Sequence, residues 1–547
     1  MDINNTLYSL NHQQEERHTQ EFAERLKMPY ADLSGYPFTD DILEVIPADQ
    51  ILRYKVMPFL KIGKNIKIGL LEPTNQETLN YLKSLEKPEG VTFIPSVISN
   101  SSFLYGMYIY QKRQQQKQQS PGQQTALEKD NLSDQIKNLV DVGKAAATVN
   151  VTKTFDVIMI GAIKVGASDV HLEPGESEFL VRYRIDGVLK DAAKLPMTHY
   201  KGLLQRIKFS AKMKMDKIGE PQDGRFSITL ADQRVDLRVA TMPSAYGEGV
   251  VIRLLSQDKS MQRLERLGFR PDALAIIRQA ITRPHGMILN TGPTGSGKTT
   301  TLYAILLEVR KPGIKIITLE DPIEYRIEGV EQSQVDPEGS YTFADGLRGT
   351  LRADPDVIMV GEIRDTETAQ IAVQAALTGH LLLSTVHANS APAVYTRLLD
   401  IGVKPFLLAG SLNLIMAQRL VRTICPKCVE EYQPPEPIWQ EIKQSLLPIL
   451  NRLDDKIKQR LNGQMLLKRG RGCTECANDG FVGRQAIIEV LKPNTEIETL
   501  VARQATQAEF FDLAVKQGMI TMEQDGLIKV LEGITTPEEV WRVTKDN

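Results

Sequence analysis

The sequence of 547 residues contains two tryptophans and four cysteines, and it has no long uninterrupted apolar run. Its longest apolar stretches, such as Phe155–Ile163 and Leu381–Leu383, are far shorter than the roughly 20 residues that a membrane-spanning helix needs. The amino terminus, MDINNTLYSLNHQQEER, has no basic region followed by an apolar stretch, so we expect no secretory signal peptide. These absences predict a cytoplasmic protein that reaches a membrane through partners or a surface contact.

The chain also lacks an excess of charge of either sign. Lysine and arginine total 66 against 68 aspartates and glutamates, for a formal net charge of -2. This balance gives no support to a nucleic-acid-binding surface across the whole chain. Hydrophobic residues at 42% and charged residues at 24% are typical of globular proteins. The length exceeds what one hydrophobic core accommodates and predicts about three or four domains.

Composition and patterning predict a multidomain α/β protein. Residues 1–110 read as a small α/β module. The glutamine-rich segment 111–131 reads as a flexible linker, with a solvated continuation of the preceding helix as the alternative. Residues 132–262 are predicted to form a second small α/β module. In 263–547 strands and helices alternate, which predicts a parallel-rich sheet covered by helices on both faces. Within that last domain, 420–490 holds all four cysteines and forms a separate subdomain.

The segment from Gly292 to Thr299 (GPTGSGKT) matches the phosphate-loop pattern G-x-x-x-x-G-K-[ST]. An apolar strand precedes it and an amphipathic helix, Thr300–Glu308, follows; a plain glycine-rich turn is the alternative. Glycines let backbone N–H groups surround phosphates, Lys298 reaches the β/γ oxygens, and the Thr299 hydroxyl binds Mg²⁺. The predicted ATP-binding residues are Gly292, Pro293, Thr294, Gly295, Ser296, Gly297, Lys298, Thr299 and Thr300.

Two carboxylates stand at the ends of predicted strands. Glu320 ends the strand that begins at Lys315, and Glu362 follows the apolar segment 356–361. Ligands of open α/β sheets bind beyond the carboxyl ends of the strands, where both acids would lie. We expect Glu320 to polarise the attacking water and Glu362 to bind Mg²⁺, directly or through water. The alternative for each is an ordinary turn or N-cap carboxylate.

Two histidines, His380 and His387, flank another buried strand, one strand after Glu362. A histidine in such a place is often a satisfied core residue. Their position along the chain nevertheless favours a role in sensing the γ-phosphate.

The cysteines form two pairs, Cys425-Pro-Lys-Cys428 and Cys473-Thr-Glu-Cys476. Each C-x-x-C supplies two sulfurs from one turn, and two such turns complete a tetrahedral Cys₄ zinc site with a structural role. The alternatives are four unrelated thiols or a redox pair. The intervening segment 429–472 is longer than a compact zinc ribbon allows, so it is predicted to be an inserted, mostly helical excursion.

The C-terminal end is predicted to be helical. Thr536 is the expected N-cap, Pro537 occupies the first helical position, and Glu539 would complete a capping box.

Taken together, these motifs resemble the GspE/PilB family of type II secretion and type IV pilus assembly ATPases, across most of the chain. The resemblance implies a RecA-like P-loop ATPase domain with Glu320 as the catalytic glutamate, Glu362 as the Walker B acid and His387 as the His-box residue. The matching motifs are the Walker A motif Gly292–Thr299, the Asp box Thr318–Glu324, the atypical Walker B Asp354–Asp365 and the His box Thr378–Asn389. The His box departs from the family at Ala388, where threonine is common.

Three segments of the second module, Gly166–Pro174, Arg182–Gly187 and Pro221–Arg225, resemble the PAS-like second N-terminal domain of the family. There, arginines complete the ATP site of a neighbouring subunit. The resemblance makes Arg225 and Arg238 candidates, since an arginine neutralises charge that develops on the γ-phosphate. Structural salt-bridge arginines are the alternative. The first module is similar to the family's docking domain.

The resemblance implies a homohexameric motor at the inner face of the cell membrane, using ATP, Mg²⁺ and Zn²⁺. Its implied partners are an inner-membrane platform protein and cytoplasmic assembly components, with no nucleic acid. Type IV pilus assembly is the leading hypothesis and type II protein secretion the alternative. A pilus retraction ATPase is less favoured, because extension and secretion motors commonly carry the cysteine pairs. A DNA-transfer ATPase is less favoured because the even charge balance gives it no support. A nucleotide-gated scaffold is disfavoured because Lys298, Glu320 and Glu362 are all present.

Overall fold

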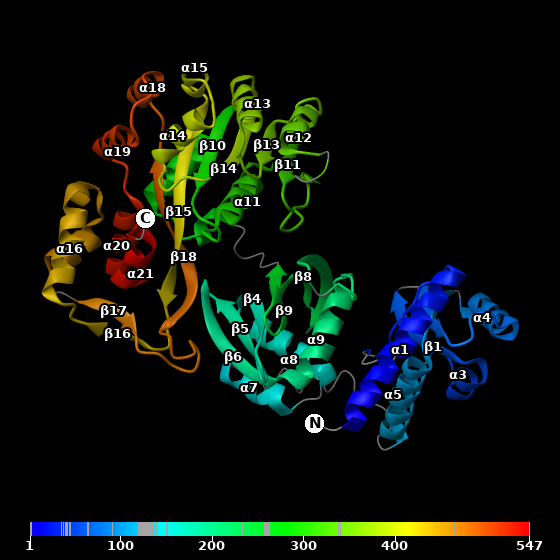
Figure 1. The fold of residues 1–547 in the computed structure, drawn as a ribbon. Helices are drawn as coiled ribbons and strands as arrows, with labels where there is room; N and C mark the ends of the chain where they lie inside the picture. The colour runs from blue at the N-terminus through cyan, green and yellow to red at the C-terminus, as the bar shows by residue number, and fades with distance from the viewer. Residues whose placement is uncertain are drawn as a thin grey trace. The chain divides into compact units, whose positions relative to one another are not determined.

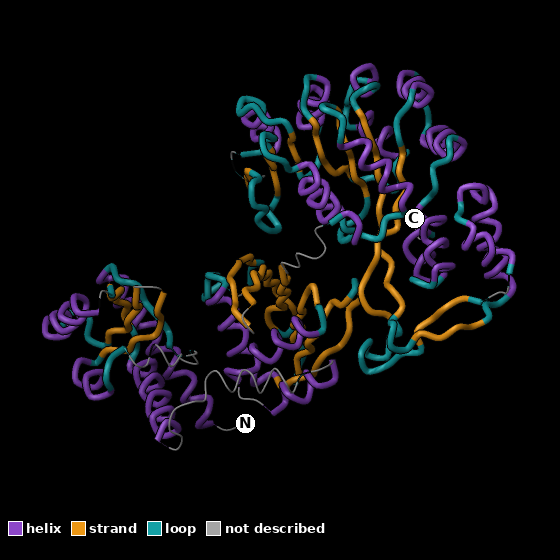
Figure 2. The backbone as a smooth tube through the Cα atoms, turned by 180° about the vertical axis from the view of Figure 1, so that it is seen from behind, coloured by secondary structure: helices purple, strands orange, loops and turns teal. Residues whose placement is uncertain are grey.

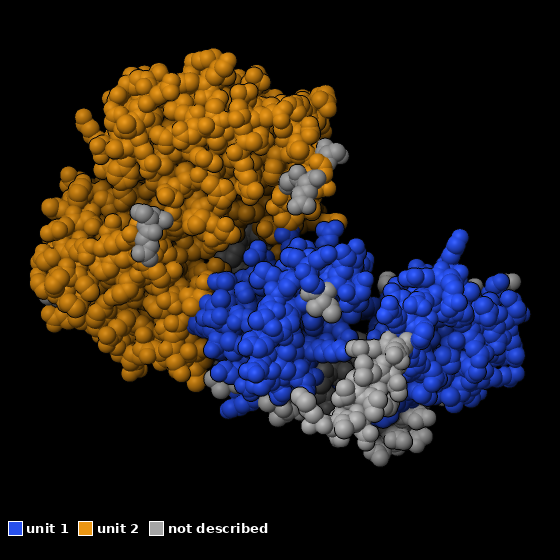
Figure 3. All heavy atoms as spheres, in the orientation of Figure 1, with its two compact units in different colours: residues 1–185, 189–254 blue, residues 186–188, 255–547 orange. Residues whose placement is uncertain are grey.

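A computed structural model describes residues 3–545, except 34–35, 37, 39–41, 43–44, 63–64, 90, 119–135, 137–138, 149–150, 218, 231–232, 256–262, 337–338, 340 and 464–465. The chain forms two compact units, 1–185 with 189–254 and 186–188 with 255–547, coloured separately in Figure 3. Among the described helices, none is both long and apolar enough to cross a membrane.

The first unit begins with a three-stranded sheet of order β1-β2-β3, in which β2 is antiparallel to β1 and parallel to β3. Alternate residues of β2 are buried, among them Ile66 and Ile68, as expected of a strand with one face on a core. The elements are α1 (Ile3–Leu26), α3 (Ala48–Tyr54), β1 (Val56–Ile62), β2 (Asn65–Leu70), α4 (Gln76–Glu89), β3 (Thr92–Val97) and α5 (Asn100–Gln118).

Helix α5 corrects part of the predicted linker. It continues to Gln118, so residues 111–118 are helical rather than a flexible chain. Glutamine, lysine and arginine are good helix formers, so a polar extension of an established helix is favourable. The rest of the predicted linker, 119–131, lies outside the described residues.

The first unit also contains a six-stranded sheet of order β6-β5-β4-β9-β8-β7. Phe179, Val181 and Tyr183 of β5 are buried in one core, and the residues between them are less buried. One face of this sheet is therefore apolar and the other polar. The elements are α7 (Leu139–Thr148), α8 (Val151–Lys164), β4 (Ala167–Pro174), β5 (Glu178–Ile185), β6 (Val188–Pro196), α9 (Met197–Ser210), β7 (Gln222–Leu230), β8 (Gln233–Ser244) and β9 (Gly247–Leu255).

The second unit is built on a seven-stranded sheet of order β12-β11-β13-β14-β10-β15-β18 (Figure 1). All neighbours are parallel except β18, which runs antiparallel to β15. The strands are β10 (Gly286–Thr291), β11 (Ile316–Glu320), β12 (Glu331–Gln334), β13 (Val357–Val360), β14 (Leu381–Val386), β15 (Leu412–Ile424) and β18 (Phe481–Leu491).

Helices cover both faces of this sheet, as Figure 2 also shows from behind. Successive residues of β10 point to opposite faces, so Ile288 belongs to one core while Met287 and Leu289 belong to the other. The Ile288 core includes α10 (Pro271–Ile281) and α11 (Lys298–Val309), whereas α12 (Phe343–Thr350), α13 (Thr366–Leu377) and α14 (Ala393–Asp400) line the opposite one. This confirms the expected parallel-rich α/β domain.

The excursion between the cysteine pairs is largely helical, as predicted, but it starts and ends in strands. β16 (Val429–Tyr432) pairs antiparallel with β17 (Leu467–Gly470), and this ribbon carries α16 (Glu436–Leu446), η3 (Leu447–Arg452) and α17 (Asp455–Asn462). The remaining elements are η2 (Leu264–Arg266), α15 (Pro405–Leu408), α18 (Thr495–Ala502), α19 (Gln507–Lys516), α20 (Met522–Glu532) and α21 (Pro537–Thr544).

Candidate functional site: a phosphate loop at the carboxyl edge of the sheet

The phosphate-loop motif lies between β10 and α11. Gly292, Gly295 and Gly297 all have positive φ, at 147°, 79° and 88°. Residues with a Cβ rarely adopt these angles, so the glycines give the loop its tight path. Helix α11 begins at Lys298 with Gly297 as its N-cap. The loop therefore stands at a helix N-terminus, where backbone N–H groups and the helix dipole favour an anion.

Lys298 turns back onto its own loop. Its Nζ donates to the carbonyl oxygens of Gly292 (2.8 Å) and Pro293 (3.0 Å). Burial lowers the pKa of Lys298, Arg419 acts in the same direction, and Glu362 opposes them. Thr299, the predicted Mg²⁺ ligand, is exposed. A lysine that bridges loop carbonyls can exchange them for phosphate oxygens with a small movement of its side chain.

Strand register brings the predicted acids to the same edge of the sheet as the loop. Leu319 lies opposite Val360, Val360 opposite Ser384, and Thr385 opposite Asn290. Because β10, β11, β13 and β14 are parallel, the residues that follow each of them meet at one edge. Glu320 is the last residue of β11, and Glu362, His387 and the phosphate loop follow β13, β14 and β10 at that edge.

Glu362 and His387 are in direct contact. The Nε2 of His387 lies 3.2 Å from Oε2 of Glu362, and the Arg364 Nε lies 2.6 Å from the same oxygen. Next to them, the Ile363 N–H donates to the Thr385 carbonyl (2.9 Å), which ties the turn after β13 to β14. The Glu362 carboxylate is thus held in a cluster of charged and ionisable groups beside the loop.

Glu320 is 3% exposed and bonded to protein donors on both carboxylate oxygens. The Tyr303 hydroxyl donates to Oε2. The Thr318 hydroxyl (2.6 Å) and the Gln332 amide (3.0 Å) both donate to Oε1. Tyr303 belongs to α11, so the helix that begins at the phosphate loop also holds the predicted catalytic carboxylate.

The structure separates the two predicted histidines. His387 follows β14 at the edge of the phosphate loop. His380 precedes β14, and its carbonyl accepts from the N–H of Gly286 at the start of β10. Six residues of strand place it roughly 20 Å from the phosphate-loop edge. The expectation of a phosphate-sensing role is therefore wrong for His380, since opposite ends of a strand lie at opposite edges of a sheet.

Arg225 and Arg238 lie in the first unit, whereas the phosphate loop lies in the second. They face each other across β7 and β8 in register. Arg225 is exposed and Arg238 half-buried. The two candidate arginines are therefore neighbours on adjacent strands.

Residues that the motif search missed also border the loop. Gln418 and Arg419 of β15 are 2% and 5% exposed, in a strand that is otherwise mostly apolar. An Arg419 guanidinium nitrogen donates to the Asn389 carbonyl (3.4 Å), in the segment after His387. The signal that could have found them is a polar pair inside a buried strand, since buried polar groups need partners.

The four cysteines converge on one point, with all Sγ atoms within 4.8 Å of one another. Three of the separations are 3.8 Å (Cys425–Cys473), 3.9 Å (Cys428–Cys476) and 3.7 Å (Cys473–Cys476). Four thiolates around one tetrahedral Zn²⁺ at about 2.3 Å would stand roughly 3.8 Å apart. The residues present therefore fit a four-thiolate metal site.

Backbone N–H groups support this cluster. Those of Cys473 (3.1 Å) and Gly480 (3.2 Å) donate to the Cys476 sulfur. Burial raises the pKa of the Cys476 thiol, but these N–H groups and the neighbouring sulfurs outweigh burial and lower it to about 7. A thiol that ionises easily is a good metal ligand.

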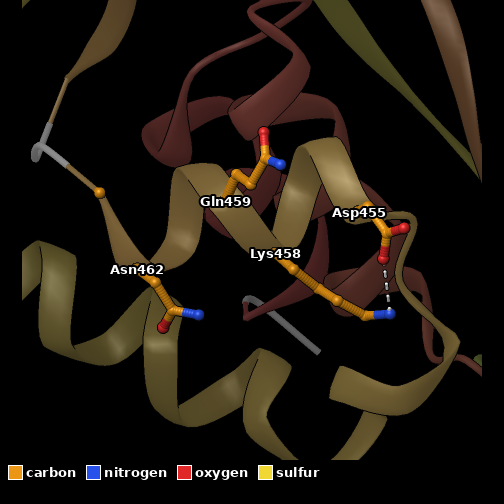
Figure 4. A pocket seen from close by; sticks show the side chains of 5 residues that line it. Asp455, Lys458, Gln459 and Asn462 are labelled. Atoms are coloured by element: carbon orange, nitrogen blue, oxygen red, sulfur yellow. Dashed lines mark hydrogen bonds and ion pairs between the residues drawn. The ribbon is translucent and has the colours of Figure 1, made fainter.

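An open depression lies on α17, in the excursion between the cysteine pairs (Figure 4). Asp455, Lys458, Gln459, Asn462 and Gly463 line it. Lys458 pairs with Asp455 (3.2 Å), as the dashed line in the figure marks. None of these residues belongs to a nucleotide motif.

The phosphate loop, the parallel sheet and the strand-end acids define a P-loop ATPase of the RecA-like class. The model of the Type II/IV secretion system protein family matches residues 144–542, and that of the MshEN domain matches 26–104. The chain belongs to the Type II/IV secretion system protein family and is an ATP-hydrolysing enzyme.

Relatives from both branches of the family match the chain. Type II secretion system protein E of Xanthomonas campestris pv. campestris is 44% identical over 415 residues, 76% of this chain and 70% of that protein. The type IV pilus assembly ATPase PilB of Myxococcus xanthus is 36% identical over 535 residues, 96% of this chain and 91% of that protein. The structure of the Legionella pneumophila ATPase DotB has a TM-score of 0.52 at 21% identity, over 72% of this chain and 95% of that chain, which shows the fold alone.

Proposed function

We propose that this chain is a hexameric motor that uses ATP hydrolysis to power type IV pilus assembly. The observation that carries the proposal is the extent of the match to the pilus assembly ATPase, which spans nearly the whole of both chains. The match includes the N-terminal module, where a docking domain gives a motor its partner. The type II secretion relative has the higher identity, but its match is shorter.

In this proposal ATP binds with its phosphates in the loop Gly292–Thr299. Mg²⁺, held by the Thr299 hydroxyl and by Glu362 directly or through water, neutralises phosphate charge when bound. Glu320 polarises the attacking water, and His387, in contact with Glu362, reads the γ-phosphate. The contact of His387 with Glu362 and the position of both at the loop's edge support these roles.

The catalytic site is completed by a neighbouring subunit. Arg225 and Arg238 enter from its first unit and neutralise the charge that develops on the γ-phosphate. Their adjacent positions on β7 and β8 support a joint role. This arrangement couples ATP binding to closure between subunits, which is how a ring of ATPases produces movement.

The remaining parts attach the motor to its machine. The module 1–110 docks onto cytoplasmic assembly components, and the hexamer acts on an inner-membrane platform protein at the cytoplasmic face of the membrane. Zn²⁺ on Cys425, Cys428, Cys473 and Cys476 stabilises the base of the excursion and takes no part in hydrolysis.

Type II protein secretion is the second candidate, favoured by the high identity to the secretion protein over the ATPase part. Pilus retraction is less favoured because of the cysteine site, and DNA transfer because of the even charge balance. A nucleotide-gated scaffold is least favoured, because Lys298, Glu320 and Glu362 are all present.

The first experiment measures Mg²⁺-dependent ATPase activity against protein concentration for the wild type, Glu362→Ala and Arg225→Ala. We expect activity per subunit to rise with concentration and to be lost in both variants. Activity that is independent of concentration and survives Arg225→Ala would contradict the shared site. Absence of turnover in a wild type that binds ATP would favour the scaffold.

A second experiment separates pilus assembly from secretion. The Glu362→Ala allele replaces the gene in its own host, and surface pili and secreted proteins are measured in the same cultures. We expect pili to disappear while the secreted proteins are unchanged. The opposite pattern would assign the motor to protein secretion.

A further inference from the structure

The long strand β15 runs past the end of its neighbour β10. Asn290 and Thr291 of β10 lie opposite Met416 and Ala417 of β15. β10 then ends and the chain turns into the phosphate loop, whereas β15 continues for several more residues. The next residue, Gln418, therefore stands beside the loop rather than beside a strand.

The side chain of Gln418 joins the two ends of the loop. Its amide oxygen accepts from the Thr301 hydroxyl (2.7 Å) and from the Asn290 side-chain amide (3.2 Å). Asn290 precedes the loop on β10, and Thr301 follows it on α11. All three residues are almost fully buried. One oxygen thus bridges the strand that enters the loop and the helix that leaves it.

Gln418 also packs against the first and last glycines of the motif. A Cβ added at Gly292 would lie 2.5 Å from the Gln418 carbonyl oxygen, and one added at Gly297 would lie 2.8 Å from its Nε2. The contact at Gly292 is with backbone, which cannot move aside easily, so this glycine is required by space as well as by its positive φ. At Gly297 the neighbouring atom is the end of the Gln418 side chain, and the positive φ is the stronger requirement for glycine.

We propose that Gln418 is a positioning residue of the nucleotide site, which holds both ends of the phosphate loop at the separation that phosphates require. A neutral amide suits this place. Its oxygen satisfies two buried donors at once, and it adds no charge beside a bound triphosphate. Removing the amide leaves the Thr301 hydroxyl and the Asn290 amide without this acceptor, in a buried place where such a loss is costly.

This inference rests on the assignment of the loop Gly292–Thr299 as the nucleotide site. Lys298→Ala therefore serves as a reference, because it tests the assignment without touching Gln418. If Lys298→Ala binds nucleotide like the wild type, the nucleotide site lies elsewhere and the proposed function fails with it. If Lys298→Ala loses binding and Gln418→Met does not, the positioning role alone is wrong.

Asn413 provides a matched control on the same strand. Its side chain is 6% exposed and donates to the His285 carbonyl (2.8 Å), while its oxygen accepts from Arg283 (3.0 Å). It also fills the space where a Cβ of Gly286 would stand. Asn413 therefore holds the start of β10 by buried hydrogen bonds, as Gln418 holds its end. The start of β10 lies at the edge of the sheet opposite the phosphate loop.

The experiment measures the dissociation constant of Mg-ADP by calorimetry and the melting temperature without nucleotide, for full-length Gln418→Met and Asn413→Leu. Both variants keep the approximate size of the side chain and remove its hydrogen bonds. We expect both variants to have a lower melting temperature than the wild type. Only Gln418→Met should bind ADP more weakly, by about tenfold, which corresponds to about 1.4 kcal/mol of binding free energy. Unchanged affinity in Gln418→Met, or equal weakening in both variants, would overturn the proposal.

A second variant covers the case in which Gln418→Met does not fold. Gln418→Glu keeps the shape of the side chain and places a carboxylate beside the phosphates. We compare the ADP dissociation constant of Gln418→Glu with that of the wild type at each pH. The variant should bind ADP more weakly than the wild type at pH 8. Its affinity should return toward the wild-type value as the pH falls, because the introduced carboxyl takes up a proton. If the dissociation constants of Gln418→Glu and the wild type are nearly equal at every pH, the positioning role is also overturned.

Discussion

Glu320 is held by side chains from three separate elements: Tyr303 from α11, Thr318 from β11 and Gln332 from β12. Gln332 also donates to the Tyr325 carbonyl (3.1 Å) and accepts from the Ile327 N–H (2.7 Å), so it fixes the segment that follows Glu320 as well. A carboxylate bound in this way has a defined orientation. Because Tyr303 lies on the helix that begins at Lys298, this hydrogen bond connects the helix of the phosphate loop to Glu320.

We predict that Tyr303→Phe lowers kcat about tenfold and leaves ADP affinity within about twofold, since the lost hydrogen bond is worth roughly 1–1.5 kcal/mol and orients the carboxylate rather than the nucleotide. Steady-state ATPase assays and ADP titration check both values. Tyr395→Phe is the matched control, because Tyr395 is equally buried but stacks on Phe510 in the core of the C-terminal helices. A kcat equal to the wild type in Tyr303→Phe would exclude this role.

Glu489 of β18 is a second buried carboxyl, and it lies near Arg419. It accepts from the N–H groups of Ala391 (2.6 Å) and Met522 (3.3 Å). Burial raises its pKa to about 7, against the opposing influence of these N–H groups and Arg419. It connects the segment after His387 to the first residue of α20.

The raised pKa of Glu489 predicts a dependence of stability on pH. Between its unfolded pKa near 4.5 and its folded pKa near 7, the folded protein binds more protons than the unfolded one. Stability therefore falls as the pH rises through this window, by about 3 kcal/mol in total. In Glu489→Gln this contribution is absent. The melting temperature of the wild type should exceed that of Glu489→Gln most at pH 5, and the difference should shrink toward pH 7.5; a difference independent of pH would contradict the assignment.

Site residues that belong to a short sequence motif could be predicted from the sequence. Site residues that contact partners far away along the chain could not. Lys298, Glu320 and Glu362 stand in short recognisable segments. Gln418 acts on Thr301, more than a hundred positions earlier, and no local pattern records that pairing. The distinction between His380 and His387 was accessible in principle, because in a parallel sheet the residue after the strand lies at the ligand edge.

At the scale of elements, α21 shows how tertiary contacts override a local signal. The helix, the N-cap at Thr536 and the proline at its first position are as predicted, but the Thr536 side chain makes no cap bond. Glu539 pairs instead with Arg422 (2.6 Å) and Arg542 (2.8 Å). Burial raises the pKa of Glu539, but the two arginines outweigh it and lower the pKa to about 2. Charge-assisted bonds to two arginines are stronger than the neutral capping-box bond that the sequence suggests for Glu539.

The helix α21 is thereby linked to the cysteine site. Arg422 also pairs with Asp479 (3.0 Å), in the loop of the second cysteine pair, and the Cys425 N–H donates to the Gly480 carbonyl (2.9 Å). These contacts join the ends of β15 and β18 where the excursion begins. The excursion was predictable from the spacing of the cysteine pairs, whereas its β16–β17 ribbon was not, because four-residue strands carry little periodicity.

We predict that the purified protein contains one zinc per chain and that Cys476→Ser loses it. Hydrogen exchange should become at least about tenfold faster in β16, β17 and the cysteine loops, because the metal closes these segments. ADP affinity should change less than about twofold, since the cluster shares no residue with the phosphate loop. Metal analysis, exchange mass spectrometry and ADP titration provide the three readouts. Exchange that is unchanged on loss of zinc would show that the metal does not hold the excursion.

At the scale of the whole molecule, the chain divides its proposed chemistry between two compact units. The loop, Glu320, Glu362 and His387 belong to the second, and Arg225 and Arg238 to the first. The parallel-rich sheet of the second unit was predictable from the alternation of strands and helices in the sequence. The assembly that would unite the two halves of a site depends on a second copy of the chain, and a single sequence contains no direct signal for it.

A mixing experiment tests that assembly. Glu362→Ala lacks the acid proposed to bind Mg²⁺ but has both arginines, whereas Arg225→Ala has an intact loop and acids but lacks one arginine. Each should be inactive alone. In an equal mixture of subunits in a ring, about a quarter of the interfaces pair an intact loop with an intact arginine, so ATPase activity should reappear at up to about a quarter of the wild-type value.

The control is an equal mixture of Glu362→Ala with Lys298→Ala. In this mixture both defects lie in the same unit and every subunit lacks a working nucleotide site, so no activity should return. A mixture of Glu362→Ala and Arg225→Ala that stays inactive after co-expression and verified co-assembly would contradict a site that is shared between neighbouring subunits.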